Sequence, residues 1–101
     1  MEVTGKCKTD FEKWLQEQPL APYPSMVWDI PLVVRNAFIV SFFDAAEIIT
    51  TIEYLEHLQQ WSGKVKDYIS KKRVDLNLHT SREKALEEAI ITANIIYNER
   101  N

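Results

Sequence analysis

The first segment with helical periodicity lies near the N-terminus. Thr9 and Glu12 have the spacing of a capping box, in which each side chain satisfies a free backbone N–H group of the first turn. Pro19 is expected to end this helix, because proline cannot donate the hydrogen bond that a helix interior requires. The apolar face of the predicted helix consists of Phe11, Trp14 and Leu15. Residues 1–8 precede the capping box and are expected to form a flexible N-terminus.

All four prolines of the chain lie between residues 19 and 31. We interpret residues 19–30 as an extended, proline-rich connector rather than a free linker, because free linkers rarely carry large apolar groups. The side chains expected to hold this connector against the domain are Tyr23, Met26 and Trp28.

A second helix is predicted over residues 31–46. Asp29 is a suitable N-cap, and Pro31 is tolerated in a first helical turn. One apolar stripe consists of Val34, Phe38, Phe42 and Ala45, with Ile39 and Phe43 beside it. Because apolar residues occupy several sides of this helix, we expect it to be central and largely buried.

The pattern changes at residue 47, where five successive β-branched residues, 48–52, favour a strand. Alternation in such a strand places four residues on one face: Ile48, Ile52, Tyr54 and Leu58. A helix is the alternative for residues 47–60, because Ala45, Ile48, Ile52 and Leu55 also have a helical spacing. We favour the strand.

Two further strands are predicted before the last helix. Ser62-Gly63 is a turn signal, so residues 61–64 are expected to turn the chain into a second strand over residues 64–69. Another turn is expected over residues 70–73. The clearest strand alternation of the chain follows, with Val74, Leu76 and Leu78 separated by Asp75 and Asn77.

The last helix covers residues 80–100. Thr80 and Glu83 form a second capping box. Glutamates in the first turns stabilise the helix, because their negative charge lies near the positive end of the helix dipole. The predicted buried face consists of Leu86, Ala89, Ile90, Ala93, Ile96 and Tyr97. The element order is therefore α-α-β-β-β-α in a single domain, residues 1–101. This order predicts an α+β fold with a small antiparallel three-stranded sheet packed against helices.

Composition restricts the classes of protein to consider. The 101 residues are 46% hydrophobic and 27% charged, which is typical of globular domains, and the net charge is −3. A chain with net negative charge lacks the overall basic character of a general nucleic-acid binder. The single cysteine, Cys7, suits a reducing compartment. No signal peptide or membrane-spanning segment is visible, so we expect a soluble cytoplasmic protein.

Three segments resemble known sequences: DFEKWL at residues 10–15, SFFDAAEI at residues 41–48, and TSREKALEEAIITANIIYNER at residues 80–100. Together they are similar to small uncharacterised proteins encoded by phages and prophages, especially of gut Bacteroidetes. Those proteins share an FFD block and a closing T-R-x-x-A…A-x-x-I-Y-N helix. Ser81 interrupts the T-R pair here, and the middle of the chain has no counterpart. The resemblance implies an accessory protein of a phage or mobile element in a bacterial host cell.

No catalytic or metal site is predicted. The polar residues that could transfer protons are Asp44, Glu47, Glu53, Glu56, His57 and His79. Asp44 and Glu47 are three residues apart, but solvated acids at a helix end are the simpler interpretation. On a strand, Glu53 and His57 share a face but Glu56 points the other way, and on a helix Glu53 and His57 are neighbours. A zinc site usually requires three or four ligands, whereas the chain has only two histidines, 22 residues apart. We therefore expect no enzyme, no metal and no cofactor.

A basic stretch is the strongest candidate for a binding surface. The segment from residue 62 to residue 73 contains five basic residues and only one acidic residue, Asp67. The candidate surface consists of Trp61, Lys64, Lys66, Tyr68, Lys71, Lys72 and Arg73. Lysines beside a stacking aromatic residue can bind nucleic acid, whereas lysines along a sheet edge also prevent unwanted strand pairing.

The leading functional hypothesis is a non-enzymatic accessory protein that binds another macromolecule, most simply a protein. The alternative hypothesis is a nucleic-acid-binding module that uses the basic hairpin face around residues 61–73. No membrane is involved in either hypothesis. The sequence leaves a homodimer open and does not identify the partner.

Overall fold

The fold is the predicted α+β arrangement. The computed structural model describes residues 3–19, 23 and 26–100. The helices are α1 (Gly5–Gln16), α2 (Leu32–Ala45) and α3 (Arg82–Arg100), with a short 3-10 turn, η1 (Val27–Asp29), and the strands are β1 (Ile48–Leu55), β2 (Gln60–Asp67) and β3 (Arg73–Asp75). The antiparallel sheet has the order β1-β2-β3, so the prediction of α-α-β-β-β-α is confirmed. Within the described part of the chain, no helix is long and apolar enough to cross a membrane.

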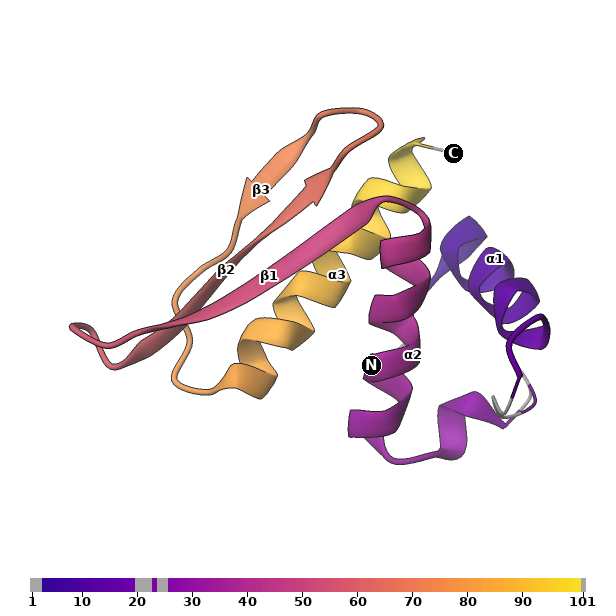
Figure 1. The fold of residues 1–101 in the computed structure, drawn as a ribbon, viewed down its shortest axis with the longest axis horizontal. Coiled ribbons are helices and arrows are strands. Elements are labelled where there is room, and N and C mark those ends of the chain that lie inside the picture. Colours follow the sequence, from indigo (N-terminus) through magenta and orange to yellow (C-terminus); the bar gives the residue numbers. More distant parts are fainter. Residues whose placement is uncertain (1–2, 20–22, 24–25, 101) are drawn as a thin grey trace.

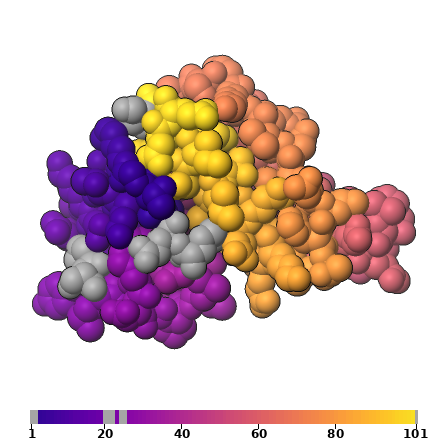
Figure 2. Space-filling view, turned by 180° about the vertical axis from the view of Figure 1, so that it is seen from behind, coloured from indigo at the N-terminus to yellow at the C-terminus, as the bar shows by residue number. Residues whose placement is uncertain are grey.

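The three helices differ in their relation to the sheet (Figure 1). Helix α3 packs against β1 and β2 on one face, and α2 contacts the sheet through the edge strand β1. Helix α1 packs on α2 and α3 instead, at the end of the molecule away from the hairpin. Seen from behind, the tip of the β1–β2 hairpin protrudes beyond the N-terminal end of α3 (Figure 2). No helix of the described residues packs on the opposite face of the sheet.

Helix α1 begins earlier than predicted, because its N-terminus is capped by α3. The N-cap is Thr4, whose backbone N–H donates to Asn94 Oδ1 at 2.9 Å. The N–H of Cys7 donates to Asn98 Oδ1 at 2.8 Å, and Asn98 Nδ2 donates back to the Thr4 carbonyl. The predicted capping box at Thr9 is therefore wrong, because Thr9 lies inside the helix.

The expectation of a flexible N-terminus over residues 1–8 is also wrong for residues 3–8. Val3 and Cys7 are completely buried, and residues 5–8 form the first turns of α1. Gly5 has a φ of 63°, which glycine adopts without strain, and this lets the chain enter the helix close to the Asn98 side chain. Residues 1–2 lie outside the described residues.

The connector is held differently from the prediction. Tyr23 and Met26 are 77% and 55% exposed, so they do not fix it. Val27 is completely buried instead, whereas Trp28 packs against the core as predicted, with its ring 5.7 Å from the ring of Phe11. The rest of the predicted extended segment includes residues 20–22 and 24–25, which lie outside the described residues.

Helix α2 is buried along only part of its length. Ile39, Phe42 and Phe43 enter the core, as predicted, but Val34 and Ala45 of the predicted stripe are exposed. The helix begins at Leu32 with Pro31 as N-cap, whereas the predicted cap, Asp29, lies in η1. The expectation of a largely buried helix is therefore wrong for its N-terminal half.

The strand prediction for residues 47–60 is confirmed over β1, whereas the position of the hairpin turn is wrong. The turn lies at residues 56–59 and closes with Gln59 at a φ of 53°. Gly63 lies within β2 opposite Ile52, and a methyl group at Gly63 would overlap the backbone carbonyl of Thr51. Gly63 thus allows β1 and β2 to approach each other closely. Leu58 was expected on the strand face but lies exposed in the turn.

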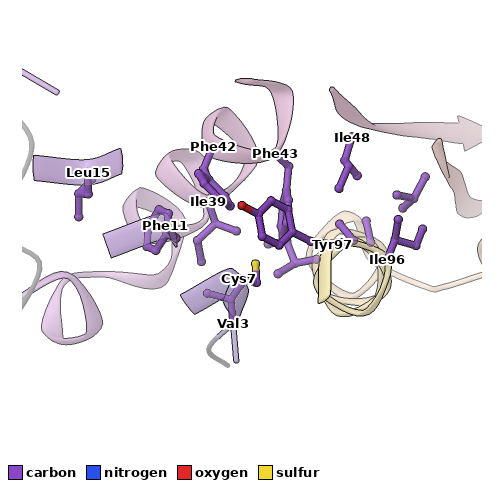
Figure 3. Close-up of a cluster of buried hydrophobic side chains, with 14 of the residues drawn as sticks. Val3, Cys7, Phe11, Leu15, Ile39, Phe42, Phe43, Ile48, Ile96 and Tyr97 are labelled. Atoms are coloured by element: carbon purple, nitrogen blue, oxygen red, sulfur yellow. The ribbon is translucent and has the colours of Figure 1, made fainter. Parts of the chain in front are cut away.

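Helix α3 supplies one side of the core. Its buried residues are Ala85, Ala89, Ile90, Ala93, Ile96 and Tyr97, with Leu86 packed beside them. The predicted capping box at Thr80 is wrong by one residue, because the N–H of Lys84 donates to Ser81 Oγ at 3.2 Å. Figure 3 shows residues of α1, α2 and α3 meeting around the ring of Tyr97. The Tyr97 hydroxyl donates to Asp10 Oδ2 at 2.6 Å, which joins α3 to α1.

A buried ion pair joins the end of β2 to the end of α3. Asp67 is completely buried, and its carboxylate accepts hydrogen bonds from Arg100 at 3.0 Å, from the N–H of Ile69 and from Ser70 Oγ. Arg100 also donates to the carbonyl of Ala46 between α2 and β1 at 2.9 Å. Burial by itself would raise the pKa of Asp67. The hydrogen bonds from Ser70 and Ile69 and the charge of Arg100 outweigh burial and hold that pKa below its ordinary value.

Replacing Ile90 with aspartate should unfold the domain. Ile90 is 1% exposed, so the variant would bury an unpaired carboxylate, and the total stability of such a domain is only about 5–15 kcal/mol. The matched control is Ile91→Asp, since Ile91 is 46% exposed on the same helix. Circular dichroism melting should show an unfolded Ile90 variant and an Ile91 variant close to wild type. Equal melting temperatures for the two variants would contradict the assigned face.

The variant Asp67→Asn should lose stability in a pH-dependent way. At pH 7 we expect a loss of about 3 kcal/mol, because Arg100 loses its buried partner. The folded-state pKa of Asp67 is lowered, so its stabilising contribution is present above the ordinary carboxylate pKa of about 4 and is lost as the pH falls. Urea unfolding at pH 7 and at about pH 3 should therefore show the gap between wild type and variant shrinking in acid. A gap of the same size at both pH values, or one matched by the exposed control Asp75→Asn, would contradict this role.

Candidate functional site

The structure places three residues of the predicted basic surface on the uncovered face of the sheet. In β2, Val65 and Asp67 point toward α3 and are buried, so Lys64 and Lys66 project from the opposite face. Arg73 lies beside Lys66 in the register of β2 and β3. We call this surface the open sheet face.

The positive charge of the open sheet face is largely balanced. Arg73 pairs with Asp75 at 3.0 Å, and Glu53 adds a second carboxylate on the same face. The Lys66 ammonium lies 4.8 Å from the ring centroid of Tyr68, just beyond the end of β2. Three cations therefore share this face with two carboxylates, which leaves a weak positive field.

Three of the predicted residues do not join this face. The Trp61 ring lies on the opposite face of the sheet, 5.1 Å from the ring of Tyr54. Lys72 forms an ion pair with Glu99 of α3 at 2.8 Å. Lys71 lies in the turn before β3 with a φ of 68°. The predicted surface is thus divided among two sheet faces and a turn.

The residues considered for proton transfer are dispersed. Glu53 lies on the open sheet face, whereas Glu56 and His57 lie exposed in the hairpin turn. Asp44 and Glu47 are exposed at the end of α2, and His79 Nε2 is hydrogen-bonded to Glu88 Oε1 at 2.8 Å. No group of three or more potential metal ligands occurs among the described residues.

Cys7 is part of the core. Burial, and to a smaller extent the charge of Asp10, raise the pKa of the Cys7 thiol to about 12. The thiol is therefore protonated at neutral pH, and an un-ionised, buried thiol is a poor nucleophile. Its sulfur lies among the apolar side chains of the core beside the Tyr97 ring (Figure 3).

A groove lies between α2, β1 and the N-terminal half of α3. We call it the α2–β1 groove; its volume is about 1040 Å³. Its apolar lining consists of Leu32, Val33, Ala37 and Val40 of α2, Ile52 of β1 and Leu86 of α3. Leu32 and Val33 are 51% and 77% exposed. Large aliphatic side chains that converge on one groove are typical of a binding surface.

One polar side chain of the groove lacks a hydrogen-bond partner. Asn36 of α2 lines the groove and is only 7% exposed, yet its Oδ1 atom accepts no hydrogen bond from the described residues. A buried acceptor without a donor costs about 1–3 kcal/mol, so such groups in native proteins call for an explanation. Less than 1 Å² of this oxygen is exposed, so a donor from a ligand reaches it only after the Asn36 side chain turns toward the groove.

Sequence reasoning missed this groove, although a signal was present. Residues 31–34 carry a run of aliphatic side chains, and α2 is apolar on several sides. We expected such a helix to be surrounded by the protein itself. A helix apolar on all sides is equally consistent with one face buried in the core and another offered to a ligand.

Comparison of the chain with protein-family models, with curated proteins and with solved structures found no match. The residues of the two candidate surfaces are therefore the basis of the functional argument.

Proposed function

We propose that this chain is a non-enzymatic protein that binds another protein through the α2–β1 groove. The observation that carries the proposal is the exposure of Leu32 and Val33 on one wall of the groove, to which β1 adds Ile52 and α3 adds Leu86. Covering one such side chain completely stabilises a complex by about 1.5–3 kcal/mol. A pocket that receives a few apolar side chains matches the pattern of interfaces in which few residues supply most of the binding energy.

The rim of the groove suits a protein partner. Glu83, Lys84 and Glu87 line the α3 side of the groove, so both signs of charge lie beside its aliphatic part. Polar, charged rims around an apolar centre are typical of protein–protein interfaces, where the rim influences partner choice more than affinity. The resemblance of three segments to phage-encoded proteins supports an accessory role in a phage or mobile element, within a bacterial cell.

Nucleic-acid binding through the open sheet face has weaker support. Each phosphate contact requires an available cation, but Arg73 is paired with Asp75, and Glu53 lies nearby. The Trp61 ring, which was expected to stack on bases, lies on the other face of the sheet. The α2–β1 groove is therefore the better-supported binding surface.

Site-specific photo-crosslinking should identify the binding surface. A photoreactive residue replaces Ala37, which is exposed on the groove wall, or Lys64 on the open sheet face as the matched position. In bacterial cells that contain the natural partner, we expect one dominant protein adduct from position 37 and none from position 64. Adding Val33→Asp should abolish the adduct, because it places a charge among the aliphatic side chains.

The fold of the Val33→Asp variant is checked by its melting temperature, which should be close to wild type because Val33 is exposed. Adducts that form only from position 64 would contradict the proposal, as would an adduct from position 37 that Val33→Asp leaves unchanged. A nucleic-acid adduct from position 64, weakened by salt, would favour the alternative function.

A further inference from the structure

The hydrogen-bonding directions of β1 follow from the pairing of β2 with the chain on its other side. Trp61 and His79 exchange both backbone hydrogen bonds, at 2.8 and 2.9 Å, and the carbonyl of Gly63 accepts from the N–H of Leu76. The odd-numbered residues of β2 therefore direct their N–H and C=O groups away from β1. In an antiparallel pair these directions alternate, so the even-numbered residues of β2 bond to β1.

The free edge of β1 follows from the same register. Lys64 is opposite Thr51, and Ser62 is opposite Glu53, so Thr51 and Glu53 direct their backbone groups toward β2. The residues between and beside them direct their backbone groups outward: Thr50, Ile52 and Tyr54. None of these outward N–H groups has a hydrogen-bond partner in the part of the chain that the structure describes.

The two edges of the sheet are protected very differently. The edge strand β3 has three residues, and two of them, Arg73 and Asp75, are charged. The other edge strand, β1, has eight residues, IITTIEYL, with Glu53 as its only charge and with no proline or lysine. Long edge strands without charges or prolines readily accept another strand.

The unprotected edge lies beside the α2–β1 groove. Thr50 and Ile52 line the groove together with Val33, Ala37 and Val40 of α2. Figure 1 shows that α2 and β1 are close where the chain joins them and diverge toward the N-terminus of α2. Unpaired backbone groups and exposed aliphatic side chains therefore face the same space.

We propose that the partner contributes one extended segment, which adds to β1 as a fourth strand inside the α2–β1 groove. This inference rests on the proposed function and specifies the form of the ligand. Backbone hydrogen bonds to Thr50, Ile52 and Tyr54 provide affinity without sequence preference. Alternate side chains of the segment point toward Leu86 on the α3 side of the sheet, so aliphatic residues are preferred at every second position.

A single segment fits this space better than the sheet of a second copy. Neighbouring strands lie about 4.8 Å apart, so a second copy paired through β1 would bring its own β2 one strand further out. The wall formed by Val33, Ala37 and Val40 of α2 faces that position across the groove. A single added segment would pair with β1 along one edge only, so its other edge would direct free backbone N–H groups toward α2. Asn36 Oδ1 of α2 is an acceptor that has no donor among the described residues.

The test uses a displayed library of random linear peptides of eight residues, the length of β1. Selected peptides are added to the ¹⁵N-labelled chain, and amide hydrogen exchange is measured by NMR. We expect enriched peptides with aliphatic residues at alternate positions. The amides of Thr50 and Ile52 should exchange at least about tenfold more slowly at saturation, because both become hydrogen-bonded. Thr50→Pro, which removes an outward N–H and leaves the bonds to β2 intact, should weaken binding about tenfold or more.

The outcomes separate this inference from the proposed function. Peptides that require Val33 but leave the exchange of Thr50 and Ile52 unchanged would overturn strand addition and leave the groove as a binding site. Failure to enrich any linear peptide would overturn strand addition as well. A chain that sediments as a dimer, with Thr50 and Ile52 protected before any peptide is added, would assign the edge to a second copy instead. Exchange that slows in wild type and not in Val33→Asp would support both proposals.

Discussion

A buried contact between Asp67 and Arg100 determines how the helices stand relative to the sheet. The two charges lie 3.0 Å apart, and the same guanidinium donates to the Ala46 carbonyl, where α2 passes into β1. Three separate parts of the chain are thus fixed at one end of the molecule. A completely buried carboxylate is tolerated only with such partners, so this end cannot rearrange without leaving a charge unpaired. From this fixed end α2 and β1 diverge, and the α2–β1 groove occupies the space between them.

The groove brings together two kinds of incomplete structure. On α2, the first turns expose Leu32 and Val33, although the second half of the helix packs in the core. On β1, the outward N–H groups have no hydrogen-bond partner among the described residues, whereas β2 provides one on the other side. Exposed apolar residues alone are common in stable proteins, whereas a long edge strand with little protection is not. Their convergence on one space, with an unpartnered Asn36 oxygen beside them, is what favours a bound peptide segment.

Local patterns predicted the element order, because a run of β-branched residues marks β1 and α3 has a continuous apolar face. The errors in the predicted element boundaries and residue roles arise where a residue contacts a partner that is far away in the sequence or on another element. Helix α1 begins at Gly5 since Asn94 and Asn98, about ninety residues away, satisfy its first turn. Gly63 resembles a turn residue but accommodates the carbonyl of Thr51. Asp67 counted only as one acid among lysines, although Arg100 gives it a structural role. The basic surface was dispersed because neighbours along β2 alternate between faces, and the groove depends on tertiary divergence that no local pattern encodes.

The most direct test of the account is amide hydrogen exchange along β1 in the free chain, measured residue by residue by NMR. We expect alternation: Thr51 and Glu53, bonded to β2, exchange slowly, whereas Thr50, Ile52 and Tyr54, directed outward, exchange rapidly. This pattern would establish that the edge beside the α2–β1 groove is open to a ligand. Slow exchange at every residue from 49 to 54 in a monomeric chain would show that the edge is already paired, and it would contradict the account.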